Sequence, residues 1–174
     1  LCNKKYNEVA YLTTHNAFNS GQDGFSLPNQ NNNIATQLND GVRGLMIDVY
    51  DNDGTTVVYH GTSFLGSKPF SIYLNDIKTF LDDNPNEIIT IILQNEPAVT
   101  ANAVENDLNQ AGLTSYLHTQ NKLSDWPTLQ TMIDNNKRLV VFNEVNNASS
   151  SQGWYLHIWD FAVEINYGKI NCDF

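Results

Sequence analysis

The alternation of short apolar strands with amphipathic helices constrains the fold of this chain more than any other feature. The predicted strands cover residues 9–15, 44–50, 88–94, 138–143 and 157–163. The segments between most of them are long enough for the helical crossovers that join parallel strands. The pattern therefore predicts an α/β fold with a mostly parallel sheet.

The connections between these strands contain four predicted helices and one irregular segment. The helices are expected to begin at Ile34, at Ser71, at Thr100 and at Ser124, the last with Pro127 in its first turn. Residues 56–60 follow the second strand after only "DNDGT", which is too short for a parallel crossover. This segment is expected to pair as a hairpin or to leave the sheet.

The alternation of side chains along the strands separates a helix-facing side from a polar side. Odd-numbered positions from 45 to 49 are apolar and suit a face covered by helices, which leaves Asp48 on the opposite face. Gln94 falls on the corresponding face of the 88–94 strand, and His15 ends the first strand. If the strands close into a barrel, these three side chains lie at the carboxyl ends, where α/β barrels build their sites.

Two histidines and a carboxylate suit the chemistry of phosphoryl transfer. One imidazole can remove a proton from an attacking hydroxyl while the other protonates the leaving oxygen, and each role is typically worth about 10²–10⁴ in rate. His15 and His60 are the candidates, with Asp48 as the nearby acid. His118 and His157 lack an acidic or strand-end context and are expected to be structural or surface residues.

Four blocks of sequence resemble the X region of phosphatidylinositol-specific phospholipases C. They are "TTHNAFNS", "GVRGLMIDVYD", "VVYHGTSF" and "NPNEIITIILQNE", in that order, with a fainter likeness in "RLVVFNE" and "LHIWDFAVE". The likeness is closest to the secreted, single-domain members. It implies a TIM-type (β/α) barrel phosphodiesterase domain over residues 1–174 that acts on a phosphoinositide or a glycosyl-phosphoinositide.

The resemblance also implies roles for particular residues. His15 would act on the inositol 2-hydroxyl as general base or stabilise the transition state, and His60 would protonate the diacylglycerol oxygen. The product would be a cyclic inositol phosphate that water then opens. Asn16 and Asp48 match positions of calcium ligands in relatives, although Asp48 could instead orient a histidine, and Gln94 would contact substrate.

The chain departs from the family where the phosphate charge is neutralised. Met46 and Gln94 stand where the calcium-dependent enzymes have glutamates, and Tyr50 stands where bacterial relatives have an arginine. Hard calcium ions prefer several oxygen ligands, so a calcium site is doubtful. Glu96 and Asp51 are close enough in sequence to be substitutes, whereas Arg43 falls on the helix-facing side and is not expected to be recruited.

Two other functions remain open at this point. The first is a catalytically inactive barrel that serves as an extracellular binding or structural module. The second, more remote, is a glycerophosphodiesterase or sphingomyelinase D, but those enzymes hold magnesium with carboxylates that the sequence around His15 lacks. TIM barrels usually have at least about 200 residues. Phe174 is therefore expected to end a fragment, an ordered region or an incomplete barrel.

Charge and cysteine content indicate which binding partners and which cellular location to expect. A net charge of −10 and a pI near 4.5 repel phosphate backbones and anionic lipids, so we expect no nucleic-acid binding and at most peripheral contact with membranes. Cys2 and Cys172 lie near the two ends and suggest a disulfide, the alternative being two free thiols. Together with Asn147 in a glycosylation pattern and Leu1 at the start, they predict a secreted or extracellular protein.

Overall fold

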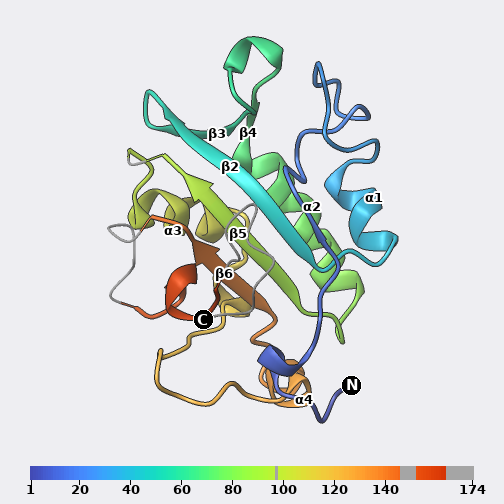
Figure 1. Cartoon of the computed structure of the whole chain (residues 1–174), viewed down its shortest axis with the longest axis vertical. Coiled ribbons are helices and arrows are strands. Elements are labelled where there is room, and N and C mark those ends of the chain that lie inside the picture. The colour runs from blue at the N-terminus through green and yellow to red at the C-terminus, as the bar shows by residue number, and fades with distance from the viewer. Residues whose placement is uncertain (97, 146–151, 164–174) are drawn as a thin grey trace, which may run out of the picture.

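A computed structural model describes residues 1–96, 98–145 and 152–163. Within these residues the chain forms one seven-stranded sheet flanked by helices (Figure 1). The strands are β1 (Thr13–Thr14), β2 (Gly44–Asn52), β3 (Thr55–Val58), β4 (Lys68–Pro69), β5 (Ile89–Asn95), β6 (Leu139–Asn143) and β7 (Tyr155–His157). β1, β2, β5, β6 and β7 pair in parallel, whereas β3 and β4 join antiparallel beside the carboxyl half of β2.

Three helices cover one face of this sheet and a fourth lies near the amino end of the chain (Figure 1). They are α1 (Ile34–Asn39), α2 (Phe70–Asp83), α3 (Ala101–Gln110) and α4 (Leu129–Asp134). Short 3₁₀ turns occur at Tyr6–Glu8, Ser63–Leu65, Thr114–Tyr116 and Ile158–Asp160. The N-terminal segment is fastened to α4, because the Leu129 N–H donates to the Lys4 carbonyl at 2.9 Å.

The two faces of the sheet bury separate apolar clusters. On the helix side, Leu45, Ile47 and Val49 are fully buried with residues of α1, α2 and α3. On the opposite side, Tyr6 and Trp126 stack with their ring centroids 4.5 Å apart, in a second cluster that also contains residues of β5 and β6. The predicted alternation along β2 is confirmed, and it leaves Asp48 on the side away from the helices.

The segment after β2 forms a hairpin, which confirms one of the two expectations for it. β3 pairs antiparallel with β2, and Val58 lies opposite Val49. Asp53 and Gly54 make the turn with φ values of 51° and 84°. Positive φ at both central residues is typical of the two-residue hairpin turn that matches the twist of the strands.

Several predicted boundaries are wrong. Of the strand expected over residues 9–15, only Thr13–Thr14 form a strand, β1, which pairs with β2. The strand expected over residues 157–163 is also wrong, because β7 ends at His157 and a 3₁₀ turn follows it. The expected helix at Ser71 begins at Phe70, after Pro69. The helix expected at Ser124 begins at Leu129, because Thr128 caps it by accepting from the Thr131 N–H at 3.2 Å. Local propensity was overridden by packing, since Trp126 in the preceding segment is buried on the sheet.

Candidate functional site

A cavity of about 510 Å³ opens at the carboxyl ends of β2 and β5. It is lined by Asp48, Tyr50, His60, Gly61, Gln94, Asn95, Glu96, Glu144 and Val145. Parallel strands place their carboxyl ends at one edge, so residues that are dispersed in the sequence meet there. Asp48 and Gln94 are also direct partners in the register of β2 and β5.

His60 is held by two polar side chains from other parts of the chain. Its Nδ1 lies 3.2 Å from Asp48 Oδ2 and 3.0 Å from the side-chain amide of Asn16. The network assigns the amide orientation in which Asn16 Oδ1 accepts from His60 Nδ1 and Asn16 Nδ2 donates to both Asp48 oxygens at 3.2 Å. Nδ1 therefore carries the proton, and Nε2 is the nitrogen left for exchange with a ligand.

The backbone around Asn16 turns sharply to bring its amide to this position. Asn16 has a φ of 49°, in the left-handed region that asparagine tolerates better than most residues. The next residue, Ala17, donates its N–H to the Met46 carbonyl of β2 at 2.8 Å. On the other side, Gln30 Nε2 donates to the His15 carbonyl at 2.7 Å. Asn16 is thus fully buried beside Asp48, while the preceding His15 is exposed.

Asp48 is an acid in a poorly solvated place. Burial raises the pKa of its carboxyl, and the hydrogen bond and charge of His60, followed by the charge of His15, lower it in part. The structure therefore brings Asn16, Asp48 and His60 together, and it places Gln94 on the wall of the adjoining cavity. His15 directly precedes Asn16 in the chain but does not line the cavity.

Sequence reasoning missed one acidic residue and one aromatic pair at this edge. Glu144 lines the cavity directly after β6, so the strand-end argument that found Asp48 and Gln94 could also have found it. Tyr50 stacks on Tyr59, with ring centroids 3.6 Å apart. Burial, with a smaller effect from nearby Asp48, raises the pKa of Tyr50 to about 12, so its hydroxyl stays protonated.

The donor groups at the site do not fit a calcium ion. Asp48 and Asn16 direct their polar atoms at each other and at His60. Among residues 1–96, 98–145 and 152–163, no group of three or more His, Cys, Asp or Glu side chains is placed to hold a metal. Calcium needs six to eight oxygen ligands, which these side chains do not supply.

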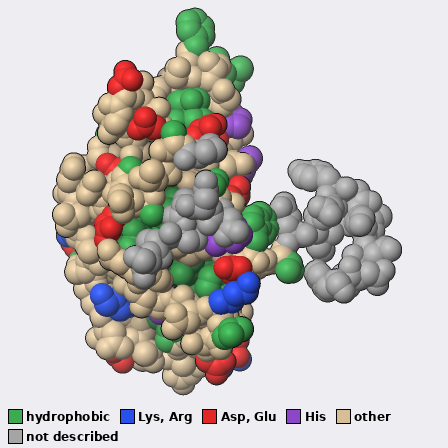
Figure 2. All heavy atoms as spheres, turned by 90° about the vertical axis from the view of Figure 1, so that its left-hand side faces the viewer, with side chains coloured by type: hydrophobic (Ala, Val, Ile, Leu, Met, Phe, Trp, Pro, Cys, Tyr) green, Lys and Arg blue, Asp and Glu red, His purple; other side chains and the backbone are tan. Residues whose placement is uncertain are grey.

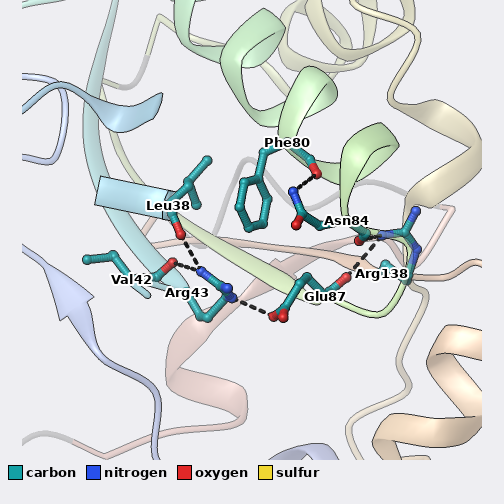
Figure 3. A network of polar contacts seen from close by, with 7 residues as sticks. All are labelled: Leu38, Val42, Arg43, Phe80, Asn84, Glu87 and Arg138. Carbon is teal, nitrogen blue, oxygen red and sulfur yellow. Dashed lines mark hydrogen bonds and ion pairs between the residues drawn. The ribbon is translucent and has the colours of Figure 1, made fainter. Parts of the chain in front are cut away.

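Arg43 lies at the opposite end of β2 and does not take part in the site, as expected from its position on the helix-facing side. Its Nε donates to Glu87 Oε2 at 2.7 Å, and its Nη1 donates to the carbonyls of Leu38 and Val42 at 2.7 and 2.8 Å (Figure 3). The described residues that line the cavity include no Lys or Arg. Among these lining residues, the imidazole of His60 is therefore the side chain that can carry positive charge.

The remaining predicted residues lie elsewhere. His118 is buried and stacks on Trp126, and neither His118 nor His157 lines the cavity. Cys2 is exposed, whereas Cys172 and Asn147 lie outside the described residues. The disulfide and the glycan therefore stay predictions.

The mostly parallel sheet and the helices on it have the fold of the TIM-barrel phospholipases C, with the sheet open over the described residues. The chain belongs to the PI-PLC X family, since the family model described as PI-PLC X 1 matches residues 1–174. The resemblance noted in the sequence and the expected fold class are thus confirmed.

Curated relatives support this assignment. A PI-PLC X domain-containing protein of Arabidopsis thaliana is 32% identical over 182 residues, which cover 94% of this chain and 42% of that protein. PI-PLC X domain-containing protein 1 of Arthroderma benhamiae is 31% identical over 81% of this chain and 48% of its own length. An uncharacterized secreted protein of the same fungus is 28% identical. The chain therefore spans less than half the length of these relatives.

Solved structures share the fold at low identity. The phosphatidylinositol-specific phospholipase C of Listeria monocytogenes superimposes with a TM-score of 0.63 at 21% identity, over 83% of this chain and 54% of that one. A variant of the Staphylococcus aureus enzyme gives 0.64 at 19% identity, over 89% and 52%. None of the helices in the described ranges is long and apolar enough to cross a bilayer.

Proposed function

We propose that this chain is a phosphoric diester hydrolase of the phosphatidylinositol phospholipase C type. The observation that carries the proposal is the geometry of His60, whose Nδ1 is held by Asp48 and Asn16 while its ring borders an open cavity. Its side chain is 46% exposed, so Nε2 can reach a ligand. Membership of the PI-PLC X family supports a phosphoinositide or glycosyl-phosphoinositide as the substrate.

In the proposed reaction the two histidines move protons on opposite sides of the phosphorus atom. His15 removes the proton from the inositol 2-hydroxyl, whose oxygen attacks the phosphorus in line with the leaving group. His60 Nε2 gives its proton to the diacylglycerol oxygen as the bond from that oxygen to phosphorus breaks. The product is a cyclic inositol phosphate, which water opens with the roles of acid and base reversed.

Asp48 and Asn16 act in this proposal as positioning residues for His60. They keep the proton on Nδ1, so that Nε2 points to substrate in a single tautomer. When His60 is protonated, the Asp48 carboxylate stabilises the imidazolium. Asn16 fixes the distance between them, because its amide bonds to both at once.

The test is phosphatidylinositol cleavage by the wild-type chain with added calcium and, separately, with a chelator. We expect turnover that the His15→Ala and His60→Ala variants lose by about 10²–10⁴-fold. His157→Gln serves as the matched control, because this histidine lies outside the cavity. Turnover that is absent in both conditions would rule out the enzyme, and equal turnover in wild type and His60→Ala would rule out His60 as the general acid.

A second candidate is an inactive barrel that binds a ligand outside the cell. The acidic lining favours it, because Asp48, Glu96 and Glu144 border the cavity and the phosphate of a substrate is itself negative. Vesicle binding, measured together with the cleavage assay, distinguishes the enzyme from the inactive module. Retained binding to phosphatidylinositol vesicles without turnover would favour the inactive module.

We further propose that the chain acts outside the cell as one domain over residues 1–174. A relative named as a secreted protein and the Cys2–Cys172 pair support this setting. Peptide mass spectrometry under non-reducing conditions should find the two cysteines in one linked peptide and a glycan on Asn147. Two unmodified thiols in protein from the extracellular medium would contradict the disulfide.

A further inference from the structure

Acidic side chains dominate the wall of the candidate cavity. Asp48, Glu96 and Glu144 line it, and none of the described lining residues is Lys or Arg. Figure 2 looks onto the side of the molecule toward which β2 and β5 run in Figure 1. Histidine and acidic side chains occur in the upper half of this face, whereas the Lys and Arg side chains that can be seen there lie in the lower half. A negatively charged phosphodiester in this cavity therefore depends on hydrogen-bond donors from the wall.

Tyr50 of β2 places a phenol on this wall. It follows Asp48 by two positions, so both side chains lie on the same face of the sheet. Tyr50, Asp48 and His60 all line the cavity, and Asp48 holds His60 at 3.2 Å. The phenol of Tyr50 therefore borders the same space as the imidazole of His60.

The ring of Tyr50 is held by the ring of Tyr59. Val57 lies opposite Tyr50 in the pairing of β2 with β3, so Tyr59 is the diagonal neighbour of Tyr50. The two rings stack with their centroids 3.6 Å apart and their planes 13° apart. Because Tyr59 directly precedes His60 in the chain, the stack fixes the phenol relative to the imidazole before any ligand binds.

The hydroxyl of Tyr50 is a protonated donor without an acceptor in the described parts of the chain. Burial, followed by the charge of Asp48, raises the pKa of Tyr50 to about 12. Among the residues that the structure describes, none is a hydrogen-bond partner of this hydroxyl. The Asn95 amide, by contrast, already donates to the Val99 carbonyl at 3.3 Å, and Gln94 is exposed. Tyr50 therefore offers this wall a side-chain donor that is both held in place and unoccupied.

We propose that the Tyr50 hydroxyl donates a hydrogen bond to a nonbridging oxygen of the substrate phosphate and stabilises the charge that builds there in the transition state. The inference rests on the proposed function, because the phosphate is that of the phosphodiester substrate. A donor that is already in place contributes more to the rate than water does, since it needs no reorganisation as charge develops. Tyr50 keeps its proton throughout, and the proton transfers remain with His15 and His60.

The first test compares Tyr50→Phe with the wild type in the cleavage of phosphatidylinositol. Phenylalanine keeps the ring that stacks on Tyr59 and removes only the hydroxyl. We expect kcat to fall by about 10²-fold with little change in KM, because the contact is strongest in the transition state. A kcat within about threefold of the wild-type value would overturn the proposal.

Tyr116→Phe is the matched control for the loss of a hydroxyl. The Tyr116 hydroxyl donates to Asp82 at 2.6 Å, and Tyr116 does not line the cavity. This variant should keep the kcat of the wild type. Thermal melts of Tyr50→Phe and Tyr116→Phe check that both variants fold as the wild type does.

Phosphorothioate substrates distinguish a contact with the phosphate from an effect on the shape of the site. Each of the two stereoisomers carries sulfur in place of one nonbridging oxygen, and sulfur accepts only weak hydrogen bonds. Tyr50→Phe should therefore lose less rate on one stereoisomer than on the other. Equal losses on both stereoisomers would show that the hydroxyl acts through the fold and not on the phosphate.

Binding of the cyclic inositol phosphate, the proposed product, separates this inference from the proposed function. Calorimetry measures the binding without turnover. If the wild type cleaves no phosphoinositide but binds the cyclic phosphate about tenfold more tightly than Tyr50→Phe does, the proposed function fails and the Tyr50 contact stands. If the wild type cleaves the lipid, His60→Ala does not, and Tyr50→Phe cleaves it like the wild type, the Tyr50 contact fails alone. Neither cleavage nor binding by the wild type would overturn both.

Discussion

The two ends of the parallel sheet use charged residues in opposite ways. At the amino end, Arg138 is buried and donates to the carbonyls of Leu81, Asn84 and Glu87 at 2.9–3.1 Å. Its Nε also reaches Asn136. Figure 3 shows Arg138 together with Arg43 where α1 and α2 end. At the carboxyl end, by contrast, a buried aspartate faces a half-exposed histidine beside a cavity.

The difference separates residues that stabilise the fold from residues that are suited to chemistry. Helix ends leave carbonyl groups without partners, and the two arginines at the amino end supply donors and a favourable charge for them. Burial of Asp48 is unfavourable for its charged form, and it therefore raises the pKa of the carboxyl. A polar group kept at such a cost is typical of a functional site.

The largest expected effect is on activity at the carboxyl end. His60→Ala should lower the rate of phosphatidylinositol cleavage by about 10²–10⁴-fold, because the proposed acid is lost. Its thermal midpoint should stay close to that of the wild type, since the side chain is half exposed. Arg43→Ala is the control at the other end of β2 and should keep the rate. If His60→Ala and Arg43→Ala lost the same rate, the proposed difference between the carboxyl and amino ends of the sheet would be wrong.

The next effect is on stability at the amino end. Arg138→Ala should lower the free energy of unfolding by about 3 kcal/mol, because three carbonyl groups lose a buried donor. Arg138→Lys should recover only part of this, since an ammonium group cannot match the planar fork of donors. Urea denaturation measures both. A loss below about 1 kcal/mol in Arg138→Ala would show that solvent replaces the arginine.

A smaller effect is expected on the pH dependence of the reaction. Asn16→Asp places a second carboxyl within 3.2 Å of Asp48, and two close carboxyls cannot both ionise easily. The acid limb of the rate profile should therefore move to higher pH by about one unit. The profile of kcat/KM against pH measures the shift. Asn16→Ala should lower the rate without moving the limb, and a limb that stays in place in both variants would contradict the coupling.

The smallest effect concerns the stability contribution of Asp48 itself. The pKa of this carboxyl is raised above its ordinary value of 3.8, so the folded state favours the protonated form. Its contribution to stability is then present below pH 3.8 and is lost as pH rises through the raised value. Asp48→Asn should gain about 0.5–1 kcal/mol over the wild type at pH 7 and lose this advantage near pH 3. Thermal melts at both pH values test this, and a less stable variant at pH 7 would refute it.

Elements with strong local signals could be predicted from the sequence, whereas their boundaries could not. The alternation in β2 placed Asp48 on the correct face, and Thr100 caps α3 by accepting from the Ala103 N–H at 3.2 Å, as predicted. Ser71 and Ser124 carry equally good cap chemistry but do not begin helices. The reason is that a cap stabilises a helix by only about 1 kcal/mol, which packing of the adjoining residues easily exceeds.

The family, the order of the strands along the chain and most residues at the carboxyl ends could be predicted from the amino-acid sequence alone. The reason is that these depend on local periodicity and on contiguous motifs. The tertiary structure was needed to show that Asn16 bridges Asp48 and His60, that Tyr50 stacks on Tyr59, and that Ser26 bonds to Leu65. These contacts join residues that are far apart in the chain, and such contacts are specified by the packing of the whole sheet rather than by any one segment.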